Sequence, residues 1–520
     1  MSEPHVNPII PGFAPDPSVV LIDGTFFLVN SSFHVFPGLP IYASKDLISW
    51  KQIGNAINRQ SQLSLTRSRT NLVDLKDLGE VMLATGGLYA PTIRRYGGIV
   101  YILCTNVIHD DDPSMDNLKQ NFIVTTDDIW SNKWSDPIYF EFDGIDPSLF
   151  FDDDGRSYIQ GSASPGPMTK INQFEVDLQT GKKLSEERKI WDGNGDIYPE
   201  GPHLYKKDGW YYLMISEGGT HENHMITVAR SKHIWGPYES FSGNPILTAR
   251  GTNEYIRYTG HCDVFQDQQG QWWGVCLGVR KADGRFIMGR ETFLTSAAWP
   301  EGEWPSLSQV KLDPKLPNGE EMVRPEGSRA VTAAPMVDYV YIRDADLQKH
   351  QFSADGNNIT LTSSPDDISQ YPKPVTFVGK RQRLLSGTSL VTMHKPGAQG
   401  KLDAKAGLVC YQDEHRYARI FYDFAESLLV FEIVNNAKSL ARTSKRSFQL
   451  GESVSLRIEY TETTYRFSFR DEQLSTDFSV LESLDTLDLT GPDFVGPIMG
   501  IFAVGAGQDF QVQFSGLQVD

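Results

Sequence analysis

The stretch PDPSVVLIDGTFFLVNSS, residues 15–32, contains the pattern that decides the fold. Apolar residues follow a proline, a turn comes at Asp23-Gly24, and a run of aromatic and apolar residues completes the unit. Short β-rich runs on both sides of such a turn predict a β-hairpin. The pattern returns four times, as APTIRRYGGIVYILCTN from 90, DPSLFFDDDGRSYIQGSA from 146, EGPHLYKKDGWYYLMISEGG from 200 and HCDVFQDQQGQWWGVCLGVR from 261.

A second repeated pattern predicts the outer strands of the units. It consists of YASKDLISWKQI from 42, TTDDIWSNKWSDPIYF from 125 and ARSKHIWGPYES from 229. Four short strands in about 55–70 residues have the size of a propeller blade. The repeats therefore predict an all-β protein in which residues 1–311 form a five-bladed β-propeller. The alternative is a β-sandwich whose turns share their spacing by coincidence.

The second half of the chain has a different pattern. The segment 312–329, LDPKLPNGEEMVRPEGSR, is rich in proline, glycine and charge, which predicts a linker. Residues 330–520 then alternate with period two, which buries one face of each strand. We therefore expect a β-sandwich of the jelly-roll or concanavalin-like kind. The alternating residues are Val454, Leu456, Ile458 and Tyr460; Tyr465, Phe467 and Phe469; and Phe510, Val512 and Phe514.

Composition limits the classes of function. The 520 residues carry a net charge of −18, which argues against a phosphate-binding surface and so against nucleic acid. No apolar run has the roughly 18–20 residues of a membrane span. The four cysteines lack C-x-x-C spacing, so neither zinc nor a disulfide framework is predicted. The first twenty residues lack a signal-peptide pattern, which predicts a cytoplasmic protein, or a secreted one if a leader has been removed.

Aligning the five hairpins places chemically active side chains at one repeated position. In a propeller the first strands line the central axis, so these positions would meet at one mouth of the channel. A proline or Gly-Pro follows each of the three acids, and Asp-Pro is also ordinary turn chemistry. Two carboxyl groups that flank a bond are the basic apparatus of glycoside hydrolysis. The five residues are Asp16, Ala90, Asp146, Glu200 and His261.

Several strings resemble glycoside hydrolase family 43, whose members include β-xylosidases and α-L-arabinofuranosidases. The N-terminal strings are NPIIPGFAPDPS, GIDPSLFFDDDG, YPEGPHLYKKDGWYYLMIS, YTGHCDVF and GRETF. TFVGKRQRLL from 376 and AGLVCYQDEHRYARIFYD from 406 are similar to the C-terminal sandwich of those members. The resemblance implies an inverting exo-glycosidase that releases terminal β-D-xylose or α-L-arabinofuranose from xylan or arabinoxylan oligosaccharides. It implies no required cofactor.

The resemblance also implies roles for single residues. Asp16 would be the general base, Glu200 the general acid, and Asp146 would orient the acid and tune its pKa. Inversion requires carboxyl groups of acid and base about 6.5–9.5 Å apart. Arg290 would contact the sugar and the acids, with a surface ion-pair partner as the alternative. His261 would bind a structural calcium ion or a water near the axis, or be a satisfied core histidine.

The sugar pocket implied by the resemblance has aromatic walls and a polar rim. Phe33 and Tyr89 are the aromatic candidates, with core packing as the alternative. Thr220 and His221, in the loop SEGGTHENH, are expected at the rim. His34-Val35 stands where xylosidase-like relatives commonly have an acidic residue and a tryptophan, and Tyr89 stands where they commonly have another tryptophan. These departures leave open whether the enzyme prefers xylose or arabinose.

Three further alternatives stay open. The enzyme could be a retaining transglycosidase on a similar propeller, with carboxyl groups about 5–5.5 Å apart, or a non-catalytic sugar-binding propeller. The C-terminal domain could be an independent carbohydrate-binding module, or it could close the pocket with Phe494 in DFVGPIMGIF. The expected partners are xylan-derived oligosaccharides, with no nucleic acid and no membrane, and the sequence leaves homo-oligomerisation undecided.

Overall fold

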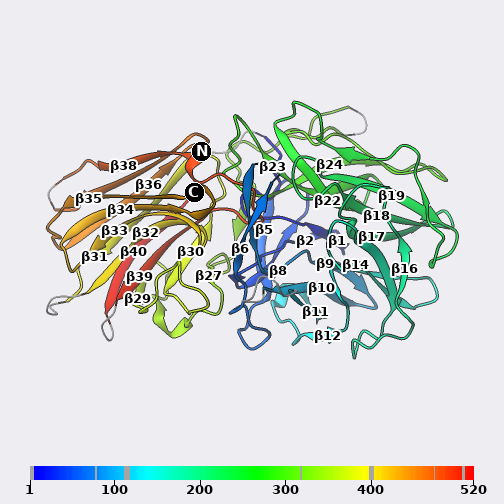
Figure 1. The fold of residues 1–520 in the computed structure, drawn as a ribbon, viewed down its shortest axis with the longest axis horizontal. Coiled ribbons are helices and arrows are strands. Elements are labelled where there is room, and N and C mark those ends of the chain that lie inside the picture. Colours follow the sequence, from blue (N-terminus) through cyan, green and yellow to red (C-terminus); the bar gives the residue numbers. More distant parts are fainter. Residues whose placement is uncertain are drawn as a thin grey trace.

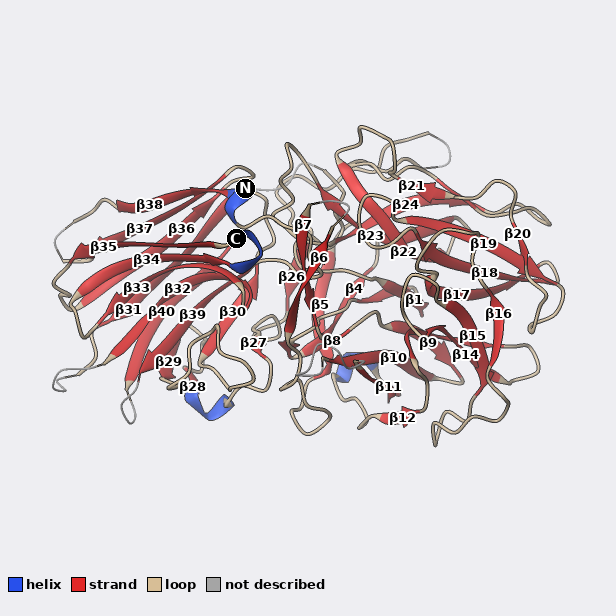
Figure 2. Cartoon of the chain, viewed as in Figure 1, coloured by secondary structure: helices blue, strands red, loops and turns tan. Residues whose placement is uncertain are grey.

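The chain is built almost entirely from β-strands (Figure 2). The computed structural model describes residues 5–76, 79–109, 117–316, 319–397, 403–473, 475–505 and 510–520. Within these ranges the helical elements are short 3-10 turns, so the all-β prediction is confirmed. These turns are η1 (Ile129–Ser131), η2 (Leu347–Lys349), η3 (Asn436–Lys438) and η4 (Thr486–Asp488).

Five sheets of four or five strands follow one another in the N-terminal part (Figure 1). The first contains β1 (Ser18–Ile22), β2 (Thr25–Val29), β4 (Gly38–Ser44), β5 (Trp50–Ile57) and β26 (Val331–Ala333). The second contains β8 (Gly87–Leu88), β9 (Thr92–Tyr96), β10 (Ile99–Ile108), β11 (Leu118–Thr126) and β12 (Ile138–Phe140). The third contains β13 (Gly144–Phe151), β14 (Ser157–Ala163), β15 (Lys170–Glu175) and β16 (Arg188–Trp191).

The fourth sheet contains β17 (Glu200–Lys207), β18 (Trp210–Glu217), β19 (Met225–Ser231), β20 (Glu239–Ser240) and β21 (Leu247–Thr248). The fifth contains β22 (Ile256–Gln266), β23 (Trp272–Arg280), β24 (Glu291–Ala298) and β25 (Ser306–Leu307). The first strands of the sheets contact one another in a closed order: β1 touches β9, β9 touches β13, β13 touches β17, β17 touches β22, and β22 touches β1. The first strands of the five predicted hairpins thus form a closed series of contacts.

The predicted turns have the backbone that a tight hairpin needs. Asp23 and Gly24 have φ values of 47° and 74°, and Asp208 and Gly209 have 52° and 71°. Positive φ at both central residues matches the right-handed twist of the two strands, and glycine adopts it without steric cost. Local sequence therefore fixes the register of these hairpins.

Two larger sheets face each other in the C-terminal part. One orders β28 (His350–Phe352), β29 (Asn358–Thr362), β40 (Gln511–Val519), β31 (Gly387–His394), β36 (Ser453–Tyr460), β37 (Thr464–Asp471) and β38 (Ser479–Asp485). The other orders β30 (Phe377–Arg381), β39 (Ile498–Gly505), β32 (Ala404–Asp413), β33 (Arg416–Asp423), β34 (Leu428–Asn435) and β35 (Leu440–Ser447). Phe467 of one sheet and Phe431 of the other lie 4.9 Å apart between ring centroids, inside one shared core.

Short strands connect the two parts. β26, just beyond the expected boundary at residue 330, pairs in parallel with β5 and so extends the first sheet. β27 (Tyr341–Ile342) pairs with β3 (Val35–Phe36) of the N-terminal part. A separate hairpin, β6 (Thr70–Leu75) and β7 (Glu80–Thr85), reaches the loop before β39, where Leu83 N donates to Pro492 O at 2.9 Å. No described helix is both long and apolar enough to cross a membrane.

The loop before β39 fits closely against the turn before β24. Gly289 has a φ of +69°, and a Cβ there would lie 2.2 Å from Val495 O. A Cβ on Gly496 would lie 2.5 Å from Met288 O. Two glycines therefore let the backbones of the two parts approach each other.

We expect Gly289→Ala to lower stability much more than Gly284→Ala. Gly284 lies in the same connection with a φ of +76°, but a Cβ there would meet nothing closer than 3.8 Å. Both variants force alanine into the left-handed region, which lowers the free energy of unfolding by about 1–2 kcal/mol. Only Gly289→Ala adds a backbone clash, for a total of about 2–5 kcal/mol. Urea denaturation of both variants measures the difference, and equal losses would contradict this account of the contact.

Candidate active site

Three of the predicted site residues share one uncommon backbone conformation. Asp16, Asp146 and His261 have φ values of 50°, 55° and 44°. Left-handed backbone at a residue other than glycine is sparse and clusters at functional sites. Register shifts occur at this level in three sheets, between Ile145 and Ser148, Glu200 and His203, and Gly260 and Asp263. Bulges redirect side chains out of the regular ladder, and the chain uses one at the site position of the third, fourth and fifth sheets.

The two aspartates are buried and hydrogen-bonded. Asp16 and Asp146 are 6% and 7% exposed. Ser31 Oγ donates to Asp16 Oδ2 at 2.6 Å, and Gly201 N donates to Asp146 Oδ2 at 2.9 Å. Gly201 has a φ of +59°, and a Cβ there would lie 2.9 Å from His261 Nδ1. The glycine after Glu200 therefore links the third and fourth sheets at the site.

The carboxyl groups influence one another electrostatically. Burial raises the pKa of Asp146. The charges of Glu200 and Asp16 raise the pKa of Asp146 further, whereas His261 and the Gly201 N–H lower it. Burial also raises the pKa of Glu200, where Arg290 lowers it and Asp16 raises it. Groups that interact in this way titrate together. The arrangement can keep one carboxyl protonated near neutral pH beside an ionised one, which is what acid–base catalysis needs.

Arg290 is a buried cation that faces these acids. It is 6% exposed, and its Nη2 donates to Thr220 Oγ1. Its guanidinium carbon lies 4.6 Å from the centroid of the Phe494 ring. Burial lowers the pKa of Arg290, whereas Asp16, Asp493 and Glu200 raise it. The guanidinium therefore compensates buried negative charge and is not a surface ion-pair partner.

The predicted aromatic residues form one cluster beside Arg290. Phe33 lies 4.9 Å from Tyr89 and 5.7 Å from Phe494 between ring centroids, and Tyr89 lies 6.0 Å from Phe494. Burial raises the pKa of Tyr89, and the charge of Asp146 raises it too. The structure thus brings together aromatic residues from the first sheet, the second sheet and the C-terminal part. Apolar ring faces suit the C–H faces of a sugar.

Thr220 and His221, both predicted at the rim, lie in the loop after β18, and they contact different parts of the protein. Thr220 reaches Arg290. His221 Nε2 lies 3.3 Å from Met82 Sδ, and its ring centroid lies 5.6 Å from that of Tyr258. Burial and the charge of Arg290 lower the pKa of His221 to about 3, so its imidazole is neutral at physiological pH.

His261 lies close to the acids Asp16 and Asp146, and a calcium ion beside it stays a prediction. Its Nδ1 is 3.9 Å from Asp16 Oδ1, and its backbone N–H donates to Ser216 Oγ at 2.8 Å. Calcium takes about six to eight oxygen ligands. In the described part of the chain, no three His, Cys, Asp or Glu side chains gather as metal ligands. Asp263, on the same strand, instead binds Arg94 through contacts of 2.8 and 3.1 Å.

The sequence analysis missed Asp493 and Arg416. Asp493 is 5% exposed, and its Oδ2 lies 2.5 Å from Arg416 Nη2. Burial raises the pKa of Asp493, and Arg416 and Arg290 lower it. This ion pair fixes the residue beside Phe494. The only signal was an acid next to the candidate aromatic in GPDFVGP, and nothing in the sequence identified its distant partner.

Comparisons with known proteins match both halves of the chain to one family. The family model described as "Glycosyl hydrolases family 43" matches residues 5–305, and "Beta xylosidase C-terminal Concanavalin A-like domain" matches residues 335–519. A non-reducing end alpha-L-arabinofuranosidase of Bacteroides ovatus is 31% identical over 96% of this chain and 92% of its own. A xylosidase/arabinosidase of Butyrivibrio fibrisolvens is 41% identical over 58% of this chain and 56% of its own.

A solved structure extends the likeness to the whole fold. The xylan beta-1,4-xylosidase of Bacillus halodurans matches with a TM-score of 0.85 and 26% identity, over 99% of this chain and 100% of the other. Sequence and structure thus agree over both halves of the protein. The chain therefore belongs to glycosyl hydrolase family 43.

Proposed function

We propose that the protein is an inverting exo-glycosidase that releases terminal β-D-xylose or α-L-arabinofuranose from xylan or arabinoxylan oligosaccharides. One observation carries the proposal: Asp16 and Glu200 both interact electrostatically with the buried Arg290 beside the aromatic cluster, and Asp146 interacts with both of these acids. The relatives named xylosidase/arabinosidase and alpha-L-arabinofuranosidase support both sugars. A panel of nitrophenyl pentosides and arabinoxylan oligosaccharides, with the products identified, tests the proposal.

The proposed architecture is a five-bladed β-propeller followed by a β-sandwich. The closed order of β1, β9, β13, β17 and β22 supports the propeller, because innermost strands surround the central axis. The single core between the two large sheets supports the sandwich. We place the boundary between the domains in residues 312–329, with β26 as a strand of the sandwich side that returns to the first blade.

The proposed roles follow from the environment of each acid. Glu200, whose pKa is raised, is the general acid and protonates the leaving oxygen. Asp16, held by Ser31, is the general base that removes a proton from the attacking water. Asp146 does not transfer a proton; its carboxylate accepts from Gly201 N, which fixes the start of β17 and so orients Glu200.

The proposed sugar position is between the acids and the aromatic cluster. Phe33, Tyr89 and Phe494 would contact the C–H faces of the pentose, and Arg290 and Thr220 its hydroxyl groups. Binding would expel water from this space and strengthen the electrostatic interactions inside it. Because Phe494 comes from the C-terminal part, that part would complete the pocket and is not a detachable binding module.

We expect Asp16→Ala and Glu200→Ala each to lower kcat/KM on xylo-oligosaccharides by at least about 10³-fold, because each removes one half of the acid–base pair. A nitrophenyl leaving group needs little protonation, so Glu200→Ala should keep more activity on it than Asp16→Ala.

The pH profile gives an independent readout. Wild-type kcat/KM should fall as the pH rises through the raised pKa of Glu200, because the acid loses its proton. Glu200→Ala should lack this fall on the nitrophenyl sugar. Glu186→Ala removes an acid whose side chain is 86% exposed and serves as the control. Equal losses on both substrates would contradict the assignment of Glu200.

Proton NMR should show inversion. A β-xyloside should first yield α-xylose, because water attacks from the face opposite the leaving group. Xylose mutarotates slowly enough for early spectra to report the initial anomer. Early formation of β-xylose would instead support the retaining alternative.

We expect Phe494→Ala to lower kcat/KM on a nitrophenyl pentoside severalfold or more. The change opens one wall of the space next to Phe33 and Arg290 and leaves water in its place. Phe478→Ala is the matched control, because Phe478 packs on Arg457 in the same domain at 3.9 Å and is not among the described ring partners of Arg290, Phe33 or Tyr89. Unchanged kinetics of Phe494→Ala would mean that the C-terminal part is remote from the chemistry.

A further inference from the structure

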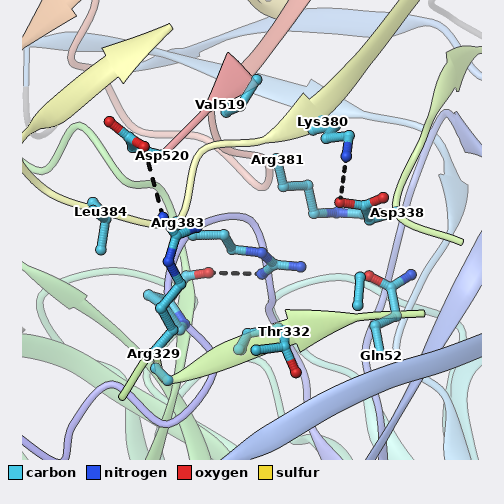
Figure 3. Close-up of a pocket in the computed structure, with 14 residues that line it drawn as sticks. Gln52, Arg329, Thr332, Asp338, Lys380, Arg381, Arg383, Leu384, Val519 and Asp520 are labelled. Carbon is cyan, nitrogen blue, oxygen red and sulfur yellow. Dashed lines mark hydrogen bonds and ion pairs between the residues drawn. The ribbon is translucent and has the colours of Figure 1, made fainter. Parts of the chain in front are cut away.

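A cavity of about 230 Å³ lies at the junction of the two parts (Figure 3). Its lining does not include Asp16, Asp146 or Glu200. Its walls come from three places: the N-terminal part, the segment around β26, and the ends of strands β30 and β40. The residues used below are Gln52, Arg329, Asp338, Lys380, Arg381, Arg383 and Asp520.

Positive charge exceeds negative charge among the side chains of this cavity. Four cationic residues line it against two aspartates, in a chain whose net charge is −18. Lys380 Nζ pairs with Asp338 Oδ2 at 3.0 Å, and Arg329 Nη2 lies 3.7 Å from Asp520 Oδ1 (Figure 3 shows the first pair). These pairs account for both aspartates and leave the guanidinium groups of two arginines.

The two remaining arginines differ in how they are satisfied. Arg383 donates to neutral oxygens only, Pro11 O at 2.7 Å and Tyr42 OH at 2.9 Å. Arg381 is 3% exposed, and none of its three guanidinium nitrogens has a hydrogen-bond partner among the described residues. Its guanidinium carbon lies 5.2 Å from the centroid of the Phe13 ring, which cannot accept five N–H bonds.

A buried guanidinium without an acceptor is energetically costly. Burial lowers the pKa of Arg381 to about 10, and the nearby charge of Arg383 lowers it as well, whereas Tyr42 and Asp338 raise it. The group is nevertheless charged at physiological pH. Gln52 adds an unsatisfied acceptor, because its buried Oε1 also lacks a partner among the described residues. The cavity therefore offers donors for an anion and an acceptor for a hydroxyl.

We propose that this cavity binds a small oxyanion that also carries a hydroxyl group, with Arg381 and Arg383 holding the anion and Gln52 accepting from the hydroxyl. The planar fork of a guanidinium matches the paired oxygens of phosphate and carboxylate. Hydrogen phosphate and a sugar acid such as glucuronate share this chemistry. The site is independent of the glycosidase chemistry proposed above.

The bound anion would hold the two parts of the protein together. Arg381 and Arg383 belong to the C-terminal part. The N-terminal part supplies Gln52 and the two partners of Arg383, Pro11 and Tyr42. A ligand that binds the folded junction and not the unfolded chain raises stability by mass action. We therefore expect the anion to stabilise the junction.

Thermal unfolding and isothermal titration calorimetry test the proposal without substrate. Inorganic phosphate and glucuronate are titrated separately, each against chloride at equal ionic strength. At least one should bind saturably and raise the Tm by about 3–6 °C. A response to phosphate alone identifies an inorganic oxyanion, and a response to glucuronate alone identifies a sugar acid.

Arg381→Met gives the decisive comparison. Without anion its Tm should equal or exceed that of the wild type, because a buried unpaired charge has been removed. The anion-dependent rise should be lost. Arg466→Met, at an exposed arginine of the C-terminal part, should keep the rise in full and controls for non-specific anion effects.

Two results would overturn the proposal. One is the absence of saturable binding of both anions to the wild type. The other is an equal response in Arg381→Met and the wild type. If Arg381→Met does not fold, Arg383→Gln replaces it, with an expected tenfold or greater loss of affinity, and unchanged affinity there overturns the proposal as well.

Discussion

The site depends on one buried cation held among carboxyl groups. Three acids around one axis cannot all be ionised away from water without a large electrostatic cost. Arg290 offsets that cost while Thr220 and Phe494 fix its position. The same guanidinium lowers the pKa of Glu200 that burial and Asp16 raise, so its placement sets the balance between protonated and ionised forms. Arg290 therefore both compensates the buried charge and influences the protonation states that acid–base chemistry needs.

The position of Arg290 in turn depends on contact between the two halves of the chain. Phe494 packs on its guanidinium, and the buried Asp493–Arg416 ion pair anchors the loop that carries Phe494. Breaking a buried pair by removing one partner leaves an uncompensated charge, which is strongly destabilising. The turn at Gly289 admits that loop because a side chain there would overlap its backbone. Stability at this junction and the shape of the proposed pocket thus share the same contacts.

The domain junction contains two kinds of buried arginine. Arg416 is paired with carboxylates in the described structure, and it holds a loop in place. Among the described residues Arg381 has no such partner, although it lies against Phe13, whose ring stacks on Phe33 at 6.2 Å. A charge that the protein leaves unpaired at a cavity is the kind of group that a ligand can satisfy. The proposed anion site would therefore sit one aromatic layer behind the sugar-facing rings.

The hairpin units and the repeated acids can be identified from local patterns in the sequence. Turn pairs such as Asp23-Gly24 specify tight hairpins through backbone sterics, and their repetition placed Asp16, Asp146 and Glu200 at equivalent positions. These are short-range effects, which a single sequence contains. Which charges meet depends on the folded chain: Asp493 pairs with a remote arginine, and Arg381 has no hydrogen-bond partner among the described residues at the junction. Such contacts join residues far apart in the chain, and their energies depend on burial, which no local pattern specifies.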